Sequence, residues 1–228
     1  NEIDHITASG LNLKKNDVYQ FAFTKELPLT VGAINRFNVD FKLGEKENSV
    51  SKTISDLSFE PTKRVTLEEF TGMGCVNCPL GIIAIDHLSQ TYGDLFIPMA
   101  LHCYTGDQLA SGVTNYAAFL NLTAAPSGRI QRGEITYPIT QDTKTGKYSF
   151  TPGENTSYDV TWQSEVESQL TKPAAAEVTA TSRLSANGKS ITVPCTVKYA
   201  LNASDVNIKL FAVVLENGLI GYQSNGFS

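Results

Sequence analysis

Two cysteines three positions apart, Cys75 and Cys78, are the residues of this sequence best suited to do chemistry. Two thiols at this spacing close into a small disulfide, exchange electrons with another disulfide, or serve as ligands of a metal ion. The spacing does not choose among these three chemistries. The elements that position the two cysteines decide among them.

The residues around the motif have the pattern of a βαβ unit. Residues 64–70 read as a strand, and residues 79–92 carry apolar side chains at helical spacing, with Gly93 placed to end the helix. Residues 95–101 are almost wholly apolar, which is typical of a strand covered on both faces. The C-x-x-C motif therefore lies between the end of a strand and the start of a helix.

This position favours redox chemistry. Free backbone N–H groups and the positive end of the helix dipole stabilise a thiolate, the form of cysteine that attacks a disulfide. We expect Cys75 to cap the helix and attack, and Cys78, one turn further on, to resolve the mixed disulfide. Gly74, Val76 and Asn77 lie beside the two sulfurs and are expected to contact the substrate.

The arrangement resembles the thioredoxin superfamily over residues 62–172. The second mark of that superfamily is a cis-proline that faces the redox pair at the start of a later strand, and Pro126 after Ala125 matches it. The resemblance implies a cis Ala125–Pro126 bond whose backbone pairs with an extended substrate. The chain departs from the usual pattern at Gly74, where the superfamily has an aromatic residue.

Residues 67–79, LEEFTGMGCVNCP, look like the Omp28-related family of Bacteroidetes outer-membrane lipoproteins. Those proteins combine a thioredoxin-like core with β-rich flanks. The resemblance implies export, a lipid anchor outside this chain, and residence in the cell envelope at the outer membrane, facing the periplasm or the surface. It implies no particular substrate.

An acid lies close to the motif in the sequence. Glu69, six residues before Cys75, shares a strand face with Val65 and Leu67, so we expect it to be buried beneath the redox pair. Burial raises the pKa of a carboxyl, and such a group can take the proton of Cys78. The alternative is a solvated acid at the end of a strand.

His102 and Cys103 end the second strand of the βαβ unit. Because parallel neighbours end at the same edge of a sheet, both should lie near Cys75. His102 is either a residue that contacts the substrate or a hydrogen-bonded structural histidine. We expect Cys103 to be a small core residue, with a third redox partner as the alternative, and Cys195 to be buried packing in a strand.

Composition and pattern describe the rest of the chain. It has 228 residues, 41% of them hydrophobic, and a net charge of −5 without a Lys/Arg cluster, which argues against nucleic-acid binding. The sequence contains no run of the roughly 18–20 apolar residues needed for a transmembrane helix. The turn-rich stretch 133–158 reads as an insertion. Strand-like runs flank the central segment at 18–23, 37–41, 49–59, 177–184, 191–199 and 208–215.

The predicted fold is an α/β thioredoxin-like core at residues 62–172. β-rich, sandwich-like modules flank it at 1–61 and 173–228, the second of them incomplete. One functional interpretation is an envelope thiol–disulfide oxidoreductase that acts on protein or peptide disulfides and needs no cofactor and no metal. The paired cysteines favour this interpretation.

The alternative is a non-catalytic surface binding lipoprotein whose C-x-x-C is a static disulfide. The β-rich flanks and Gly74 favour this second interpretation. A metal-binding variant would use Cys75, Cys78 and His102, since two thiolates and an imidazole suit Cu(I) or Zn. The sequence leaves open whether the protein is an enzyme.

Overall fold

The chain forms two compact units, and each is described here by itself. The computed structural model describes residues 2–104, 106–110, 114–139 and 161–224. One unit consists of residues 1–60 and 175–208, and the other of residues 61–174 and 209–228. Whereas the sequence divides the chain into three successive modules, the structure groups residues 209–224 with the segment that contains the two cysteines.

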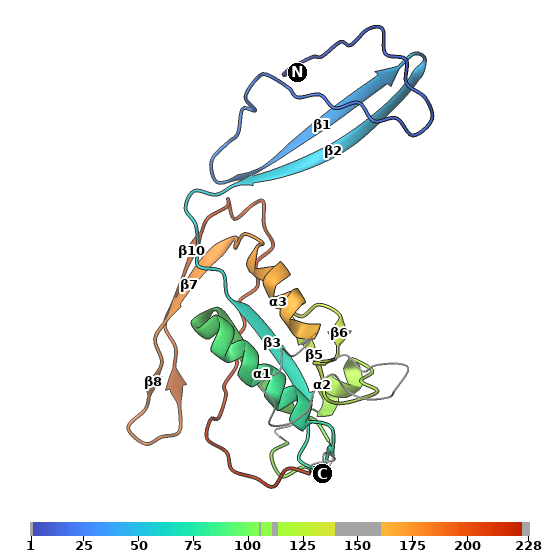
Figure 1. Ribbon diagram of the computed structural model, residues 1–228. Helices are drawn as coiled ribbons and strands as arrows, with labels where there is room; N and C mark the ends of the chain where they lie inside the picture. Colours follow the sequence, from blue (N-terminus) through green and yellow to red (C-terminus); the bar gives the residue numbers. More distant parts are fainter. Residues whose placement is uncertain (1, 105, 111–113, 140–160, 225–228) are drawn as a thin grey trace. The chain divides into compact units, whose positions relative to one another are not determined.

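The second unit is built on a four-stranded mixed sheet (Figure 1). Its strands, in spatial order, are β4 (Phe96–His102), β3 (Val65–Thr71), β5 (Ser127–Ile130) and β6 (Ile135–Thr136). β3 and β4 are parallel, whereas β5 is antiparallel to both β3 and β6. Helix α1 (Pro79–Tyr92) and the short 3-10 helix η1 (Gly93–Leu95) connect β3 to β4, which confirms the predicted βαβ unit.

The predicted bounds of helix α1 are confirmed at both ends. Pro79 is its first residue, a position where a missing N–H removes no intrahelical hydrogen bond. The helix stops at Gly93, which takes the positive φ angle of 51° and donates its N–H to the carbonyl oxygen of Ser89. A side chain with a Cβ is disfavoured at that backbone angle, so glycine ends the helix there.

The helices cover both faces of the sheet. Helix α1 and helix α3 (Thr161–Leu170) pack on one face, and the buried residues of this layer form one hydrophobic core: Val65, Leu67, Ala84, Leu88, Phe96, Ile130, Trp162 and Val166. The short helix α2 (Thr114–Phe119) contacts the other face, where the ring of Tyr116 lies 6.0 Å from that of Phe70. Successive residues of β3 therefore enter two different layers.

The first unit is rich in β-structure, as predicted. Each of its sheets in the described residues has two strands, and all three pairs are antiparallel. The pairs are β1 (Ala33–Leu43) with β2 (Lys46–Asp56), β7 (Ala176–Ala180) with β10 (Cys195–Tyr199), and β8 (Arg183–Leu184) with β9 (Ile191–Thr192). The sandwich-like arrangement of these strands stays a prediction.

Three predictions about the flanking residues are wrong. Residues 18–23 and 208–215 form no strands, although both runs are rich in the apolar and aromatic side chains typical of strands. A strand also needs a neighbour that accepts and donates its backbone hydrogen bonds, and neither run has one in the described chain. Cys195, which we expect to be buried, is exposed. It lies in β10, which pairs only with β7 in the described chain, and four of the five residues of β10 are exposed.

The predicted insertion at residues 133–158 begins with β6, and its part from 140 onward lies outside the described residues. None of the helices in the described chain combines the length and the apolar character required to cross a bilayer.

Candidate functional site

The two cysteines form a disulfide in the loop between β3 and α1. Their Cα atoms lie 5.3 Å apart, and the carbonyl oxygen of Cys75 accepts a hydrogen bond from the N–H of Cys78 at 3.2 Å. Cys75 is half-buried, whereas Cys78 is fully buried. Of the two sulfur-bearing residues, Cys75 is therefore the one that a partner molecule reaches.

The structure corrects which cysteine caps helix α1. Cys78 is the N-cap residue, and its carbonyl oxygen accepts hydrogen bonds from the N–H groups of Gly81 and Ile82. Cys75 lies in the turn before the helix, where its N–H donates to the carbonyl oxygen of Gly72 at 3.0 Å. No side chain caps the helix, and its own first turn contains no acid that would offset the positive end of the helix dipole.

Pro126 lies beside the disulfide, as the sequence predicts. The Ala125–Pro126 bond is cis, and the Sγ atom of Cys75 lies 3.6 Å from the carbonyl oxygen of Ala125. Pro126 is buried and Ala125 is half-buried. The expected pairing of this backbone with an extended substrate stays a prediction.

The predicted burial of Glu69 is confirmed. The residue is 1% exposed, and within the described residues its Oε1 atom has no hydrogen-bond partner. Removal from water raises the pKa of Glu69 from 4.5 to about 8, because the ionised form loses its hydration without gaining a compensating charge. At neutral pH the carboxyl of Glu69 in the folded protein is therefore mainly protonated.

Helix α1 makes room for Glu69 through a glycine that the sequence analysis overlooked. Gly81 follows Cys78 by three residues, and a Cβ atom at Gly81 would overlap the Oε1 atom of Glu69. The same Cβ would lie 3.1 Å from the Cβ of Pro126. The only available signal was a glycine inside a helix, which costs helical stability and so calls for a packing reason.

A second network supports the loop from the side of β4. The Oδ2 atom of Asp107 accepts hydrogen bonds from the N–H of Met73 at 2.7 Å and from Nδ1 of His102 at 3.0 Å. Burial alone would raise the pKa of Asp107, but these bonds and one from the N–H of Leu109 together hold it below 3.8. His102 thus contacts the loop through Asp107, and it does not line the pocket at the disulfide.

The third support comes from the far end of the chain and has no signal in the sequence. The side-chain amide of Gln223 donates to the carbonyl oxygens of Gly72 at 3.2 Å and Cys75 at 3.0 Å. The N–H of Ser224 donates to the carbonyl oxygen of Met73 at 2.8 Å. Residues 221–224 therefore lie alongside residues 72–75.

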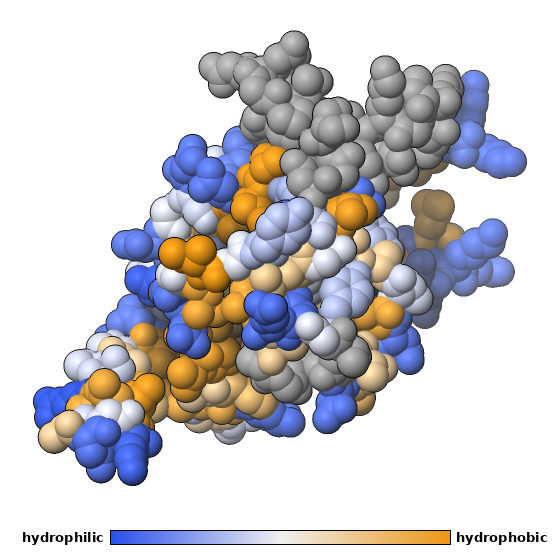
Figure 2. All heavy atoms as spheres, turned by 90° about the horizontal axis from the view of Figure 1, so that it is seen from below, coloured by the Kyte–Doolittle hydropathy of each residue, from blue (hydrophilic) through white to orange (hydrophobic). Residues whose placement is uncertain are grey.

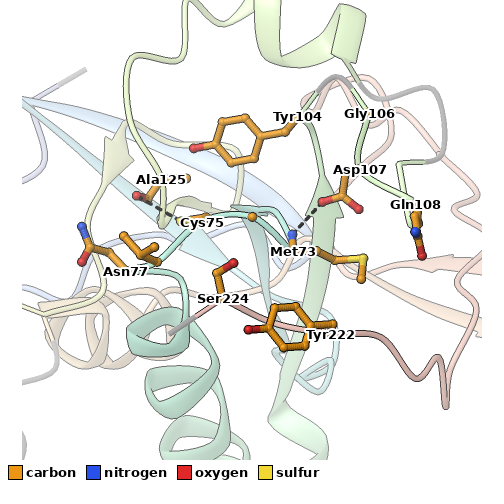
Figure 3. Close-up of a pocket in the computed structure, with 12 residues that line it drawn as sticks. Met73, Cys75, Asn77, Tyr104, Gly106, Asp107, Gln108, Ala125, Tyr222 and Ser224 are labelled. Atoms are coloured by element: carbon orange, nitrogen blue, oxygen red, sulfur yellow. Dashed lines mark hydrogen bonds between the residues drawn. The ribbon is translucent and has the colours of Figure 1, made fainter. Parts of the chain in front are cut away.

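These segments surround an open pocket of about 730 Å³ at the disulfide (Figure 3). The expected contact residues Gly74, Val76, Asn77 and Ala125 line it together with Cys75. Residues 73, 104, 106–108, 222 and 224, which the sequence analysis did not single out, complete it. In Figure 3 Tyr104 and Tyr222 lie on opposite sides of the chain segment that carries Met73 and Cys75.

The remaining cysteine of this unit is not part of the disulfide pocket. Cys103 is a half-buried free thiol whose Sγ lies 3.5 Å from the carbonyl oxygen of Thr71. Burial is the main cause that raises the pKa of Cys103, so the thiol is held in its neutral form. It lines a smaller neighbouring pocket of about 390 Å³.

The described residues contain no group of three His, Cys, Asp or Glu side chains placed to hold a metal ion. The metal-binding variant therefore gains no support from the geometry of this part of the chain. Comparison with protein-family models, with curated proteins and with solved structures finds no match.

Replacing Gly81 with alanine tests the contact with Glu69. In an unconstrained helix this change adds up to about 1 kcal/mol of stability. Here we expect it to lower the free energy of unfolding by about 1–3 kcal/mol, because the new Cβ overlaps the buried carboxyl. Urea unfolding followed by the fluorescence of Trp162 measures this, since the only tryptophan of the chain lies in the core of this unit.

Gly74→Ala is the matched control, because no atom lies within 4 Å of a Cβ added at Gly74. Its stability should stay within about 0.5 kcal/mol of the wild type. A Glu69→Ala/Gly81→Ala double variant should lose less stability than the sum of the two single variants. A stabilised Gly81→Ala variant would show that Glu69 does not occupy this space.

The pH dependence of stability tests the environment of Glu69. Because burial raises its folded-state pKa to about 8, the protonated carboxyl contributes stability that is full below about 4.5 and is lost as the pH rises through 8. Between these values the folding equilibrium of the wild type should fall by up to about tenfold per pH unit relative to Glu69→Gln. Unfolding curves measured at several pH values give the free energy of unfolding of both proteins. If Glu69 were ordinarily hydrated, the two free energies would change with pH in parallel over this range.

Proposed function

We propose that the second unit is a thioredoxin-like domain and that its C-x-x-C pair exchanges electrons with the disulfides of proteins or peptides. The observation that carries the proposal is the pairing of a reachable Cys75 with a fully buried Cys78 beside the cis Ala125–Pro126 bond. The strand order β4-β3-β5-β6, with one parallel and two antiparallel neighbours, supports the same fold.

Each residue of the site has a role in the proposed exchange. In the reduced protein the thiolate of Cys75 attacks one sulfur of a substrate disulfide, which forms a mixed disulfide and releases the other substrate sulfur as a thiolate. The thiolate of Cys78 then attacks Cys75, closing the intramolecular disulfide and releasing the second substrate thiol. The substrate gains two electrons and the protein loses two, so a dithiol donor must restore the reduced form.

In its ionised form, a minor fraction at neutral pH, Glu69 accepts the proton that Cys78 must lose before the second attack. Its carboxyl lies against Gly81, one helical turn from Cys78, and its raised pKa of about 8 is close to that of an ordinary thiol near 8.5. Proton transfer between groups of similar pKa has little thermodynamic cost. Glu69→Gln should therefore slow the release of substrate from Cys75 and leave the first attack nearly unchanged.

We propose further that the protein works in the cell envelope as a relative of the Omp28-related lipoproteins, attached at the outer membrane through a lipid outside this chain. The resemblance of residues 67–79 supports this location. Partners would then be proteins or peptides that contain disulfides.

A second candidate is a binding module in which the disulfide is static. The loop of the disulfide is held from two sides, by Asp107 at Met73 and by Gln223 at Cys75, which suits a fixed structural element. The two functions differ in whether the disulfide opens during the protein's working cycle.

Reduction of insulin by dithiothreitol distinguishes the two candidates. The wild type should accelerate the precipitation of insulin chains, and Cys75→Ser should abolish the acceleration. Cys103→Ser serves as the matched control and should keep it, because that thiol lies outside the disulfide pocket. A wild type that is no faster than Cys75→Ser would favour the static disulfide.

Trapping of mixed disulfides tests the order of attack. Cys78→Ala removes the resolving thiol, so the variant should accumulate covalent complexes when expressed in its native envelope. Cys75→Ala should accumulate none, because the buried Cys78 does not reach a partner. Non-reducing gels against reducing gels show the difference, and complexes formed equally by both variants would contradict Cys75 as the attacking residue.

A further inference from the structure

We propose that the pocket at the disulfide selects peptides whose cysteine is followed or preceded by an aromatic or aliphatic residue, and that Tyr104 and Tyr222 are the walls that receive that residue. The inference rests on the proposed function and names the class of substrate. Gln223 acts as a positioning residue, because it holds the segment that presents Tyr222.

The charge of the pocket favours an uncharged occupant. Among the described residues that line it, Asp107 is the one with an ionised side chain. Both oxygens of Asp107 are already engaged, Oδ2 by Met73 and His102 and Oδ1 by the N–H of Leu109. Both oxygens of this carboxylate therefore bond groups of the protein. Its negative charge disfavours a ligand with an acidic residue at this place.

The exposed side chains of the pocket are aromatic and apolar. Tyr222 is 80% exposed, Val76 is 50% exposed and Tyr104 is 42% exposed. Tyrosine rings exposed at the rim of a pocket bury a large area against a partner while the hydroxyl stays in water. Met73, which also lines the pocket, adapts its shape to different side chains.

The surface around the pocket agrees with this chemistry. Figure 2 views the molecule from below relative to Figure 1, toward the end at which β3 passes into the disulfide loop. Apolar and weakly polar side chains gather in the middle of this face. A short peptide with uncharged residues therefore meets a surface of matching character.

The wall formed by Tyr222 is held in place on both sides. On one side a Cβ added at Gly221 would lie 2.8 Å from the Cε atom of Met73, so this backbone packs directly on the loop. On the other side the amide of Gln223 bonds the carbonyl oxygen of Cys75, and Ser224 bonds Met73. The backbone on either side of Tyr222 is thus held against the disulfide loop.

The expected occupant of the pocket is a peptide that is attached to the sulfur of Cys75 through a disulfide. A peptide joined to this sulfur places the neighbours of its own cysteine in the pocket that Tyr104, Tyr222 and Ala125 line. The pocket, at about 730 Å³, is within the range of about 300–1,000 Å³ that ligand sites commonly have. It therefore accommodates a short peptide segment.

The test uses mixed disulfides at equilibrium and does not depend on turnover. The Cys78→Ala chain is incubated in a glutathione buffer with competing peptides that differ only in the residue next to cysteine: tyrosine, leucine, serine, lysine or glutamate. Mass spectrometry of proteolytic fragments measures which peptide is attached to Cys75. The exposed Cys195 of the same molecule is the internal control, because it lies in a strand of the other unit.

At Cys75 we expect the tyrosine peptide to exceed the serine peptide by about threefold to tenfold, the range that one aromatic contact supplies. The glutamate peptide should be the least abundant. At Cys195 all five peptides should attach about equally. Equal attachment at both cysteines would overturn the proposed selectivity.

Four further variants identify the walls. Tyr104→Ala, Tyr222→Ala and Gln223→Glu, each combined with Cys78→Ala, should bring the tyrosine-to-serine ratio at Cys75 close to one. Gln223→Glu keeps the size of the side chain but removes the N–H donors that hold Cys75 and Gly72. Tyr137→Ala, an exposed tyrosine of the same unit outside the pocket, should keep the ratio. Unchanged ratios in the first three variants would overturn the assignment of the walls.

Failure of this proposal and failure of the redox function are distinguishable. Selective attachment at Cys75 without insulin reduction would end the catalytic proposal and leave a peptide-binding pocket. Insulin reduction without selective attachment would keep the oxidoreductase and end the role of the two tyrosines. Fluorescence of Trp162 in every variant confirms that the core of the unit remains folded.

Discussion

Strand β3 is hydrogen-bonded along both edges, and the site depends on this constraint. Glu69 lies opposite Ala100 of the parallel strand β4 and opposite Gly128 of the antiparallel strand β5. A strand held on two sides has little freedom to shift, so the place where it ends is determined as well. The disulfide loop begins at that end. Helix α1 follows the loop and packs its buried residues into the same hydrophobic core as β3.

Glu68 and Glu69 are neighbours on β3, but they face opposite sides of the sheet and have different surroundings. Glu68 faces the layer of α2, where Arg132 and the hydroxyl of Tyr116 donate to its two oxygens. Glu69 faces helix α1, where Gly81 leaves space but no donor reaches Oε1. Glu68 is thus paired with Arg132, and both of its oxygens accept hydrogen bonds. Glu69 has no such partner at Oε1, so its protonated form is favoured.

The loop of the disulfide is assembled from three distant parts of the chain. Asp107 reaches it from the segment after β4, Ala125 from the segment before β5, and Gln223 from a separation of 148 residues in sequence. Asp107 and Gln223 bond backbone groups of the loop and so fix its path, whereas the carbonyl oxygen of Ala125 lies against the Sγ atom of Cys75 itself. The half-buried sulfur is thereby held at the edge of a pocket whose walls come from elsewhere.

The sequence by itself determined the local frame of the site. Pro79 and Gly93 mark the ends of α1, and the alternation of β3 turned Glu69 toward the core, because helix boundaries and strand faces follow from short-range backbone preferences. The same reasoning failed for residues 18–23 and 208–215, whose strand-like patterns have no partner strand in the described chain. It also could not assign Gly81 or Gln223. Only the tertiary structure decided those, because the space required by a buried carboxyl and the partner of a loop carbonyl depend on which distant segments pack together.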